Sequence, residues 1–447
     1  MRFVIVHIVG TLILWVTLVN DTFAQSFYAQ GGRIADFNGK ELADTFAVQI
    51  KGLPPQIDTN FGLTKVCFDI THGRVSDLKI ELINPAGASI WLSNRNGGDV
   101  GGNYNGTCFR ANGFSGYIQD GKAPFEGEYT PNGRFEFLNN HTNPNGTWKL
   151  LISDLKTGLR GSLNFFTLEF SSNPMPNLTK GPCSIENGAG CTCGDEGASC
   201  ELLPDFVILP TFTQTQWKEY PKDDPYYPGQ LRFAASIANI GDGPLETIGK
   251  GEWYCGNTLV DSASKCADGA FPRQKLYQRV YKKKGDKIEW YDYEAGTNYF
   301  DDQPGHNHFH VDGWVEFRLI KKQKKGLIEK KVVIGKSRKV SYCLFDSGIC
   351  NNDGLCQVDS VNFGQKNLPN YGMGNYVDCK SKKQGISVGG YDTYGMMYEG
   401  QYIQLPKGLK SGQYFLEIEI DPSRIYKEKK RSNNLFTMPV VISKQSS

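Results

Sequence analysis

The sequence predicts a mostly β protein in which an N-terminal β-sandwich is followed by a second β-rich domain. Short runs alternate apolar and polar residues between turn signals, long helical patterns are scarce, and both aromatic residues (12%) and glycine (51 residues) are abundant. Alternation of this kind is typical of half-buried strands. The length of 447 residues fits two domains of ordinary size.

The first 24 residues, MRFVIVHIVGTLILWVTLVNDTFA, have the features of a secretory signal. Arg2 precedes an apolar run, and small residues lead to a cleavage point after Ala24. An uncleaved membrane anchor is the alternative, but the apolar run over residues 3–19 is rather short for a bilayer. No later segment of the sequence is apolar enough to cross a membrane. We therefore expect a secreted, extracellular protein with no stable membrane span.

Charge and cysteine content narrow the function further. The net charge of +2, with 21% charged residues, argues against nucleic acid as the main partner. Twelve cysteines in an exported chain favour disulfide bonds. They form four local groups with an even number in each: Cys67 and Cys108; Cys183, Cys191, Cys193 and Cys200; Cys255 and Cys266; Cys343, Cys350, Cys356 and Cys379. Pairing within each group is expected, with zinc binding by Cys191 and Cys193 as the alternative.

The N-terminal half contains the clearest strand patterns. After a lead segment at residues 25–46, residues 47–172 include the runs VCFDI, LKIELI, ASIWLS, TWKLLISD and LNFFTLEF. Turns such as NPAG, NRNGG and NPNG separate them. Short strands at this spacing predict a β-sandwich.

The C-terminal half begins after a segment without periodicity. Residues 173–205 are rich in Cys, Pro and Gly, which indicates a linker. Residues 206–443 contain further strand-like runs, among them QLRFAASIANIG, KLYQRVY, WVEFRLI, KVSYCLF, QYIQL and QYFLEIEI. Basic stretches at 282–287 and 321–326 lie between such runs. We interpret them as solvated hairpin tips, with attraction of an anionic partner as the alternative.

Three of the six histidines, His306, His308 and His310, occupy the pentapeptide HNHFH. Alternate side chains of an extended strand point to the same face, so the three imidazoles are expected to project together. Positions i and i+4 lie roughly 13 Å apart on a flat strand, so the segment must bend for all three rings to reach one ion. Gly305 and Gly313 make that bend easier.

This histidine cluster is a candidate metal site. Neutral imidazole is a good ligand for copper, zinc or iron. Three clustered imidazoles without a metal would repel one another once protonated, so a metal site is favoured over three half-exposed strand histidines. Zinc is usually closed by a cysteine or a carboxylate, whereas copper accepts three imidazoles with solvent. The triplet alone does not choose between these metals.

Part of the N-terminal half resembles a known module. The segments SDLKIELINPAGASIWLSNRNGGDVGGNYNGTCF and NNHTNPNGTWKLLISDLKTGLRGSLNFFTLEF are similar to the P domain found downstream of subtilisin-like proprotein convertases. The resemblance covers most of residues 47–172 and implies a jelly-roll sandwich. A protease domain does not precede it in this sequence. We therefore expect an accessory module whose candidate partner is an extracellular protein or a glycan.

The C-terminal half resembles lysyl oxidases in four blocks. HNHFH is similar to the HxHxH copper motif of that family. KVSYCLFDSGIC and QGISVGGYDTYGMMYEGQYIQL resemble the stretches that hold the family's cofactor lysine and cofactor tyrosine. The tail KSGQYFLEIEIDPSRIYKEKKRSNN resembles its last strands. The blocks follow the family's order within residues 206–443, which implies a lysyl-oxidase-like, β-rich catalytic domain.

The resemblance assigns roles to individual residues. It implies that His306, His308 and His310 bind copper. It also implies that Lys339, the first residue of KVSYCL, joins the oxidised ring of Tyr394, the last residue of YDTY, to form lysyl tyrosylquinone (LTQ). With this cofactor the protein would oxidise primary amines, most of all peptidyl lysine, to aldehydes with O2, and release hydrogen peroxide and ammonia.

Two further expectations concern residues near the cofactor pair. Asp392 is a candidate for the base that removes the α-proton of the substrate, with a turn or hydrogen-bonding role as the alternative. The resemblance implies a short loop disulfide between Cys343 and Cys350. Two glycines stand where the family has cysteine, so Cys356 is the partner that we expect for Cys379.

Two other functions stay open at this point. A catalytically inactive, metal-binding extracellular adhesion or matrix protein would keep the histidines and the fold but would form no quinone. A different metal-dependent oxidase, or a binding protein whose sandwich does the work, is the third interpretation. Retention of both Lys339 and Tyr394 favours the amine oxidase.

Overall fold

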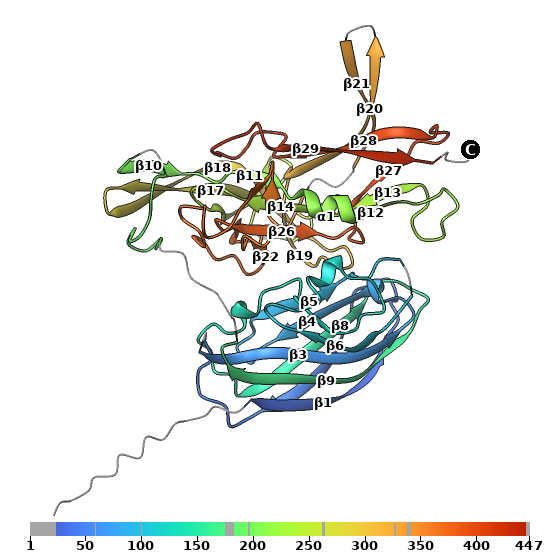
Figure 1. Ribbon diagram of the computed structural model, residues 1–447, viewed down its shortest axis with the longest axis vertical. Coiled ribbons are helices and arrows are strands. Elements are labelled where there is room, and N and C mark those ends of the chain that lie inside the picture. The colour runs from blue at the N-terminus through green and yellow to red at the C-terminus, as the bar shows by residue number, and fades with distance from the viewer. Residues whose placement is uncertain are drawn as a thin grey trace, which may run out of the picture.

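The computed structural model describes residues 24–58, 60–99, 101–174, 183–194, 197–261, 264–325, 328–337 and 341–443. These residues form two β-rich domains that lie one above the other in Figure 1. The predicted order of a β-sandwich and a second β-rich domain is therefore confirmed. The predicted signal, apart from Ala24, lies outside the described residues. No helix within the described ranges has the length and apolar character needed to cross a membrane.

The N-terminal domain is a sandwich of two sheets. Its strands are β1 Gln25–Ile34, β2 Ala43–Ile50, β3 Phe61–His72, β4 Leu78–Ile83, β5 Ser89–Asn94, β6 Tyr104–Phe109, β7 Glu128–Tyr129, β8 Gly146–Asp154 and β9 Gly161–Ser172, with 3-10 turns η1 Val75–Asp77, η2 Ile118–Asp120 and η3 Phe135–Phe137. One sheet has the order β1-β9-β3-β6-β7, and the other has the order β2-β8-β4-β5. The segment at residues 25–46 supplies β1, which pairs with β9 along its length.

The sandwich core follows from the alternation in the sequence. In β4, Ile80 and Leu82 are fully buried between the sheets, whereas Glu81 lies on the opposite face and is half-buried. Trp148 is also fully buried, and its indole N–H donates to the carbonyl of Pro144 over 2.8 Å. Removal of these apolar side chains from water stabilises the two-sheet arrangement. The outer face of β4 and β5 does not belong to this core and is available for contact with the second domain.

The C-terminal domain contains several smaller sheets. Its strands are β10 Ser199–Leu202, β11 Phe206–Ile208, β12 Trp217–Glu219, β13 Gln230–Phe233, β14 Ala235–Asn239, β15 Leu245–Cys255, β16 Thr258–Val260, β17 Arg273–Lys284, β18 Lys287–Asp301, β19 His308–Val311, β20 Val315–Lys325, β21 Ile328–Lys336, β22 Gly348–Ile349, β23 Gln357–Val358, β24 Val361–Asn362, β25 Lys383–Ile386, β26 Gly390–Tyr394, β27 Tyr402–Gln404, β28 Gly412–Ile420 and β29 Leu435–Ile442, with helix α1 Pro210–Thr215. The sheet β16-β15-β17-β18-β19 ends on the histidine strand, and the sheet β11-β14-β26-β22 contains the strand of Tyr394.

One predicted strand is wrong. The run KVSYCLF was expected to be a strand, but its described part, residues 341–345, is irregular and makes only a single bridge, between Tyr342 and Val311. Side chains replace the missing sheet partners. The amide of Cys343 donates to the Tyr394 hydroxyl over 2.6 Å, and the amide of Leu344 donates to Gln384 Oε1 over 3.0 Å. The apolar character of this run therefore reflects burial against the site.

The six disulfides stay within the predicted groups, but two expected pairings are wrong. The pairs are Cys67–Cys108, Cys183–Cys191, Cys193–Cys200, Cys255–Cys266, Cys343–Cys379 and Cys350–Cys356. Cys343 bonds Cys379 because the segment at residues 341–345 lies against Tyr394, where Cys379 is also close. The carbonyl of Cys379 accepts a hydrogen bond from the amide of Phe309 over 3.0 Å. The disulfide therefore links the segment against Tyr394 to the histidine strand.

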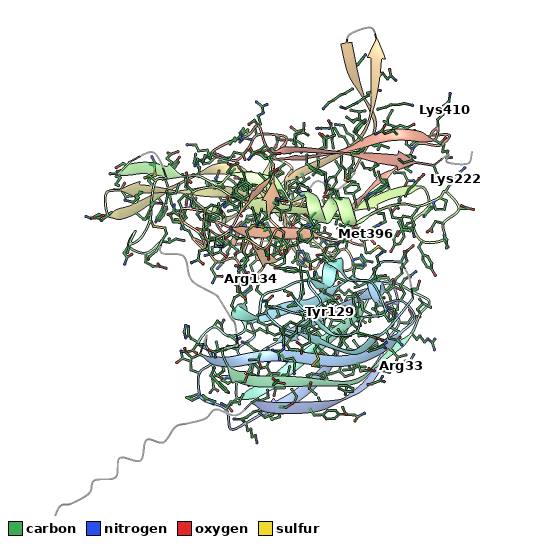
Figure 2. All side chains as sticks on the ribbon, viewed as in Figure 1. Arg33, Tyr129, Arg134, Lys222, Met396 and Lys410 are labelled. Atoms are coloured by element: carbon green, nitrogen blue, oxygen red, sulfur yellow. A yellow bond between two sulfur atoms is a disulfide. The ribbon has the colours of Figure 1, made fainter. Side chains whose placement is uncertain are left out.

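The two domains are in direct contact. Arg95 Nη1 lies 3.3 Å from Glu399 Oε1, and Arg134 Nη1 lies 3.7 Å from Asp346 Oδ2. Figure 2 shows Arg134 at the boundary between the domains. The outer face of β4 and β5 meets the histidine region, because Trp91 of β5 packs against the C-terminal domain.

Candidate metal centre

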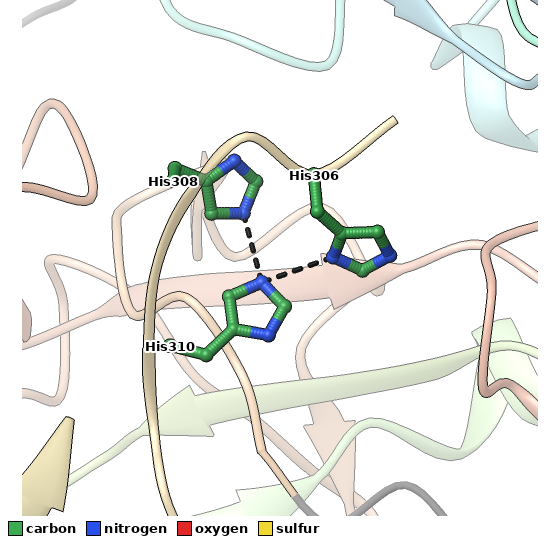
Figure 3. Close-up of side chains that lie close together, drawn as sticks. All are labelled: His306, His308 and His310. Atoms are coloured by element: carbon green, nitrogen blue, oxygen red, sulfur yellow. Dashed lines mark hydrogen bonds between the residues drawn. The ribbon is translucent and has the colours of Figure 1, made fainter. Parts of the chain in front are cut away.

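The three histidines converge from one short stretch of chain. His308 and His310 lie on β19 and point to the same side, whereas His306 precedes the strand. Nε2 of His310 lies 3.0 Å from Nδ1 of His306 and 2.9 Å from Nε2 of His308, as Figure 3 shows. His306 and His310 are buried, and His308 is half-buried. The predicted convergence of the triplet is therefore present, although only two of the histidines belong to the strand.

The predicted bend lies just before β19. Gly305 has φ 87° and Asn307 has φ 56°, so both residues adopt left-handed conformations on either side of His306. Glycine and asparagine tolerate this region better than other residues. The turn at Asn307 lies between His306 and His310 and brings their rings together, which an extended strand could not do.

The arrangement fits a single metal ion. Two ring nitrogens held at about 2.0–2.1 Å from one ion, at an angle of about 90°, lie roughly 2.9 Å apart. The separations of 3.0 and 2.9 Å match this spacing. Asp301 Oδ2 lies 3.2 Å from Nδ1 of His310 and 3.7 Å from Nδ1 of His306. A carboxylate in this position fixes the orientation of a ligand imidazole and increases its basicity.

A second cluster of histidine and cysteine side chains near the site is not a candidate metal centre. His308, Cys343 and Cys379 also lie within metal-binding distance of one another. The two cysteines form a disulfide, however, and a metal needs the thiolate. The histidine triplet is therefore the candidate centre.

Tyr394 lies next to the histidines in the core of the domain. It is 3% exposed, and the centre of its ring is 6.3 Å from that of His310. Its ring stacks on Tyr342 with centres 3.8 Å apart, and the Tyr398 ring packs edge-on against it with centres 5.4 Å apart. The hydroxyl accepts the hydrogen bond from the Cys343 amide. These contacts hold the phenol in one orientation beside the imidazoles.

The environment keeps this phenol protonated. Burial raises the pKa of Tyr394 well above its usual value, and the negative charge of Asp392 raises the pKa further. Asp392 is fully buried on β26, two residues before Tyr394 and therefore on the same face of the strand. The turn role considered for Asp392 is therefore wrong, because the residue lies within a strand.

Lys339, the second residue of the expected cofactor pair, lies outside the described residues. The chain is described up to Ser337 and again from Ser341. Tyr342, the next residue after Ser341, lies against Tyr394. Tyr342, which stacks on the Tyr394 ring, is the third residue after Lys339 in the sequence.

A cleft at the boundary between the domains leads to the histidines. Its volume is about 770 Å³, and both domains line it. His306 and His308 face it from the C-terminal domain, and Glu81 and Trp91 face it from the sandwich. The Trp91 ring lies 5.5 Å from the His308 ring and 5.2 Å from the Phe345 ring, measured between centres.

Several residues of this site could not be identified from the sequence alone. Asp301 had a local signal, since the acidic pair DD stands only a few residues before the histidines. Tyr342 lies in the block KVSYCLFDSGIC, but nothing in the sequence shows that it stacks on Tyr394. Glu41 and Trp91, which line the cleft from the other domain, are related to the histidines by no sequence pattern.

Comparison with protein families gives two matches. The proprotein convertase P-domain family matches residues 63–170, and the lysyl oxidase family matches residues 294–446. The second range includes the histidine triplet and Tyr394. Residues 294–446 therefore match a lysyl oxidase domain. The preceding sandwich contains a P domain, so both resemblances noted in the sequence are confirmed.

Individual relatives agree with the lysyl oxidase match. Protein-lysine 6-oxidase of Homo sapiens is 28% identical over 131 residues, which cover 29% of this chain and 25% of the relative. Lysyl oxidase homolog 1 of Homo sapiens is 30% identical over 131 residues, which cover 29% of this chain and 18% of the relative. The chain thus spans a quarter or less of the length of these relatives. A solved complex of a serine protease from Aeromonas sobria with its chaperone is 16% identical, covers 33% of this chain and 27% of that chain, and has a TM-score of 0.20.

Proposed function

We propose that the protein is a secreted, copper-dependent amine oxidase that acts through lysyl tyrosylquinone. The observation that carries the proposal is the position of Tyr394, a buried phenol whose ring centre is 6.3 Å from that of His310. Oxidation of a phenol by O2 requires a metal close to the ring, and the converging imidazoles supply a site for one. The match of residues 294–446 to lysyl oxidases supports the same chemistry.

His306, His308 and His310 would hold the copper ion, and Asp301 would orient His310. Copper(II) favours nitrogen ligands near right angles to one another, and the nitrogen separations support this choice. Tyr394 and Lys339 would be joined as the quinone. When present, lysyl tyrosylquinone supplies an electron sink that takes two electrons from a primary amine and delivers them to O2.

The chain's own residues orient and protect the reacting groups. Tyr342 and the Cys343 amide restrain the ring of Tyr394, and burial of the ring excludes water. Asp392 is the proposed base for the α-proton of the substrate, since its carboxylate lies close enough to raise the pKa of Tyr394. Lys339 can attack an oxidised ring only as a neutral amine, which burial favours.

The proposed overall reaction converts a primary amine, O2 and water to an aldehyde, ammonia and hydrogen peroxide. Peptidyl lysine is the proposed substrate class, since the matched relatives include protein-lysine 6-oxidases. Export is part of the proposal. Six disulfides within the described residues support an oxidising compartment.

The test is expression of the full chain with copper, followed by redox staining for quinone and measurement of peroxide release from a lysine-containing peptide. Lys339→Ala and Tyr394→Phe should each abolish both signals. Lys336→Ala, on the exposed side chain three residues upstream, and Tyr402→Phe are matched controls that should retain both. A copper-loaded protein without quinone would instead support the inactive, metal-binding matrix or adhesion protein.

A further inference from the structure

The sandwich reaches across the domain boundary to the histidine segment. Glu41 lies between β1 and β2, and its side chain is 9% exposed. Its Oε2 accepts a hydrogen bond from the amide of Gly305 over 2.8 Å and another from Nδ2 of Asn307 over 3.0 Å. One carboxylate oxygen therefore binds the residues on both sides of His306.

These two partners are the residues that form the bend. Gly305 and Asn307 have left-handed backbone conformations, with φ 87° and 56°. A non-glycine residue in this region is strained, and the strain persists only where the surroundings hold it. Without the bend, His306 could not approach His310 to 3.0 Å. The hydrogen bonds of Glu41 stabilise the conformation on which convergence of the triplet depends.

The position of Glu41 is itself fixed by the sandwich. Its Oε1 accepts a hydrogen bond from Nζ of Lys79 on β4 over 3.0 Å, and both side chains are nearly buried. Charge-assisted hydrogen bonds in a site with little water are stronger than those at an open surface. The carboxylate is therefore held on one side by its own domain and on the other side by the histidine segment.

Apolar contacts from the sandwich accompany this link. A side-chain carbon at Gly305 would lie 3.1 Å from Leu155 Cδ1, so the sandwich packs directly on the backbone at the bend. Trp91 packs against His308. The sandwich thus contacts the segment before and after His306, and lines the same cleft as His306 and His308.

We propose that Glu41 is a positioning residue of the metal centre, and that the sandwich domain is a structural part of that centre. This inference rests on the proposed function for the identity of the ion. It assigns the P domain of this chain a task inside the oxidase site, in place of a separate binding role. The sandwich keeps His306 in place, and the metal ion is held at full affinity only when both domains are docked.

The test measures copper affinity of the full-length protein by competition with a chelator. Glu41→Ala should weaken copper binding by about ten- to a hundredfold, the range found when an outer partner of a metal ligand is removed. Asn307→Gly keeps the left-handed backbone but removes the amide donor, and it should weaken binding by less. The double variant should bind copper about as weakly as Glu41→Ala alone, because both changes break the same link. The copper(II) EPR spectrum of Glu41→Ala should differ from that of the wild type.

Two control variants separate positioning from general destabilisation. Glu126→Ala removes an exposed sandwich carboxylate that bonds Asn105 away from the histidines. Val48→Ala removes buried sandwich volume and lowers thermal stability. Both variants should keep the copper affinity and EPR spectrum of the wild type.

The outcomes distinguish this inference from the proposed function. Wild-type affinity and an unchanged spectrum in Glu41→Ala would overturn the role of Glu41, whatever the quinone assay shows. An equal loss of affinity in Val48→Ala would also overturn it, since stability of the sandwich alone would explain the effect. A wild-type protein that binds copper but forms no quinone would refute only the oxidase. A wild-type protein that binds no copper would refute both.

Discussion

Removal of Arg134 should destabilise the docked protein strongly. Its guanidinium lies 3.7 Å from the fully buried carboxylate of Asp346 across the domain boundary. Asp346 also accepts hydrogen bonds from the amide and hydroxyl of Ser387 and from the amide of Tyr376, over 2.8, 2.5 and 3.1 Å. Arg134→Met keeps the apolar part of the side chain and leaves Asp346 without its counter-charge.

The magnitude follows from the distance and the burial. Two unit charges about 4 Å apart attract by roughly 4 kcal/mol at an effective dielectric of about 20. Glu136 shares the guanidinium, and the hydrogen bonds to Asp346 remain, so the loss is smaller than this value. We expect Arg134→Met to lower the free energy of unfolding by about 2–3 kcal/mol, near the lower limit for breaking a buried ion pair.

The loss should depend on pH. Burial raises the pKa of Asp346, and the positive charge of Arg134 opposes that increase. Without Arg134 the pKa rises further, so the folded protein retains a proton that the unfolded chain has released. Stability then falls as the pH rises, and the deficit of Arg134→Met should be larger at pH 8 than at pH 5.

Urea unfolding followed by tryptophan fluorescence measures these effects. The exposed residue Arg160 provides a matched control, and Arg160→Met should unfold like the wild type. In an Asp346→Asn background, Arg134→Met should cost little more, which gives a coupling energy of about 2 kcal/mol. A wild-type unfolding curve for Arg134→Met, or purely additive losses in the double variant, would refute the reasoning.

Three further predictions concern single side chains. Burial raises the pKa of Glu428 from 4.5 to about 7. The free energy of unfolding should therefore fall by up to about 3 kcal/mol as the pH rises from 4.5 to 7. Glu428→Gln should remove this pH dependence, as measured by urea unfolding at several pH values. Asp301→Asn should weaken copper binding about tenfold, measured by chelator competition, because His310 loses the carboxylate beside its Nδ1; unchanged affinity would contradict this role. Tyr342→Phe leaves the Gln401 amide without its buried acceptor and should cost about 1–2 kcal/mol of stability, while the preserved ring stack should leave quinone staining unchanged.

Local patterns predicted much of the fold. The run LKIELI became β4 Leu78–Ile83 without an offset, because its alternation places Ile80 and Leu82 in the core. The convergence of the histidines was also predictable, since three ligands within five residues need only one bend. Gly305 signalled where part of that bend would lie.

Contacts between distant segments could not be predicted in this way. The partner of Cys343 is Cys379, 36 residues away, and the choice depends on how the segment folds over Tyr394. An apolar run such as KVSYCLF looks the same in the sequence whether neighbouring strands or side chains accept the hydrogen bonds of its backbone amides. The links of Glu41 and Trp91 to the histidine segment depend on how two separately folded surfaces dock, and docking leaves no periodic pattern.

Peptide mapping of the copper-loaded protein by mass spectrometry shows whether Lys339 and Tyr394 become covalently joined. We expect a proteolytic peptide containing Lys339 to be recovered covalently joined to the peptide containing Tyr394, with the mass of the quinone cross-link. The same digest of protein prepared without copper should yield the two peptides separately. Recovery of both peptides unmodified and unlinked from fully copper-loaded protein would show that the proposed lysyl tyrosylquinone does not form.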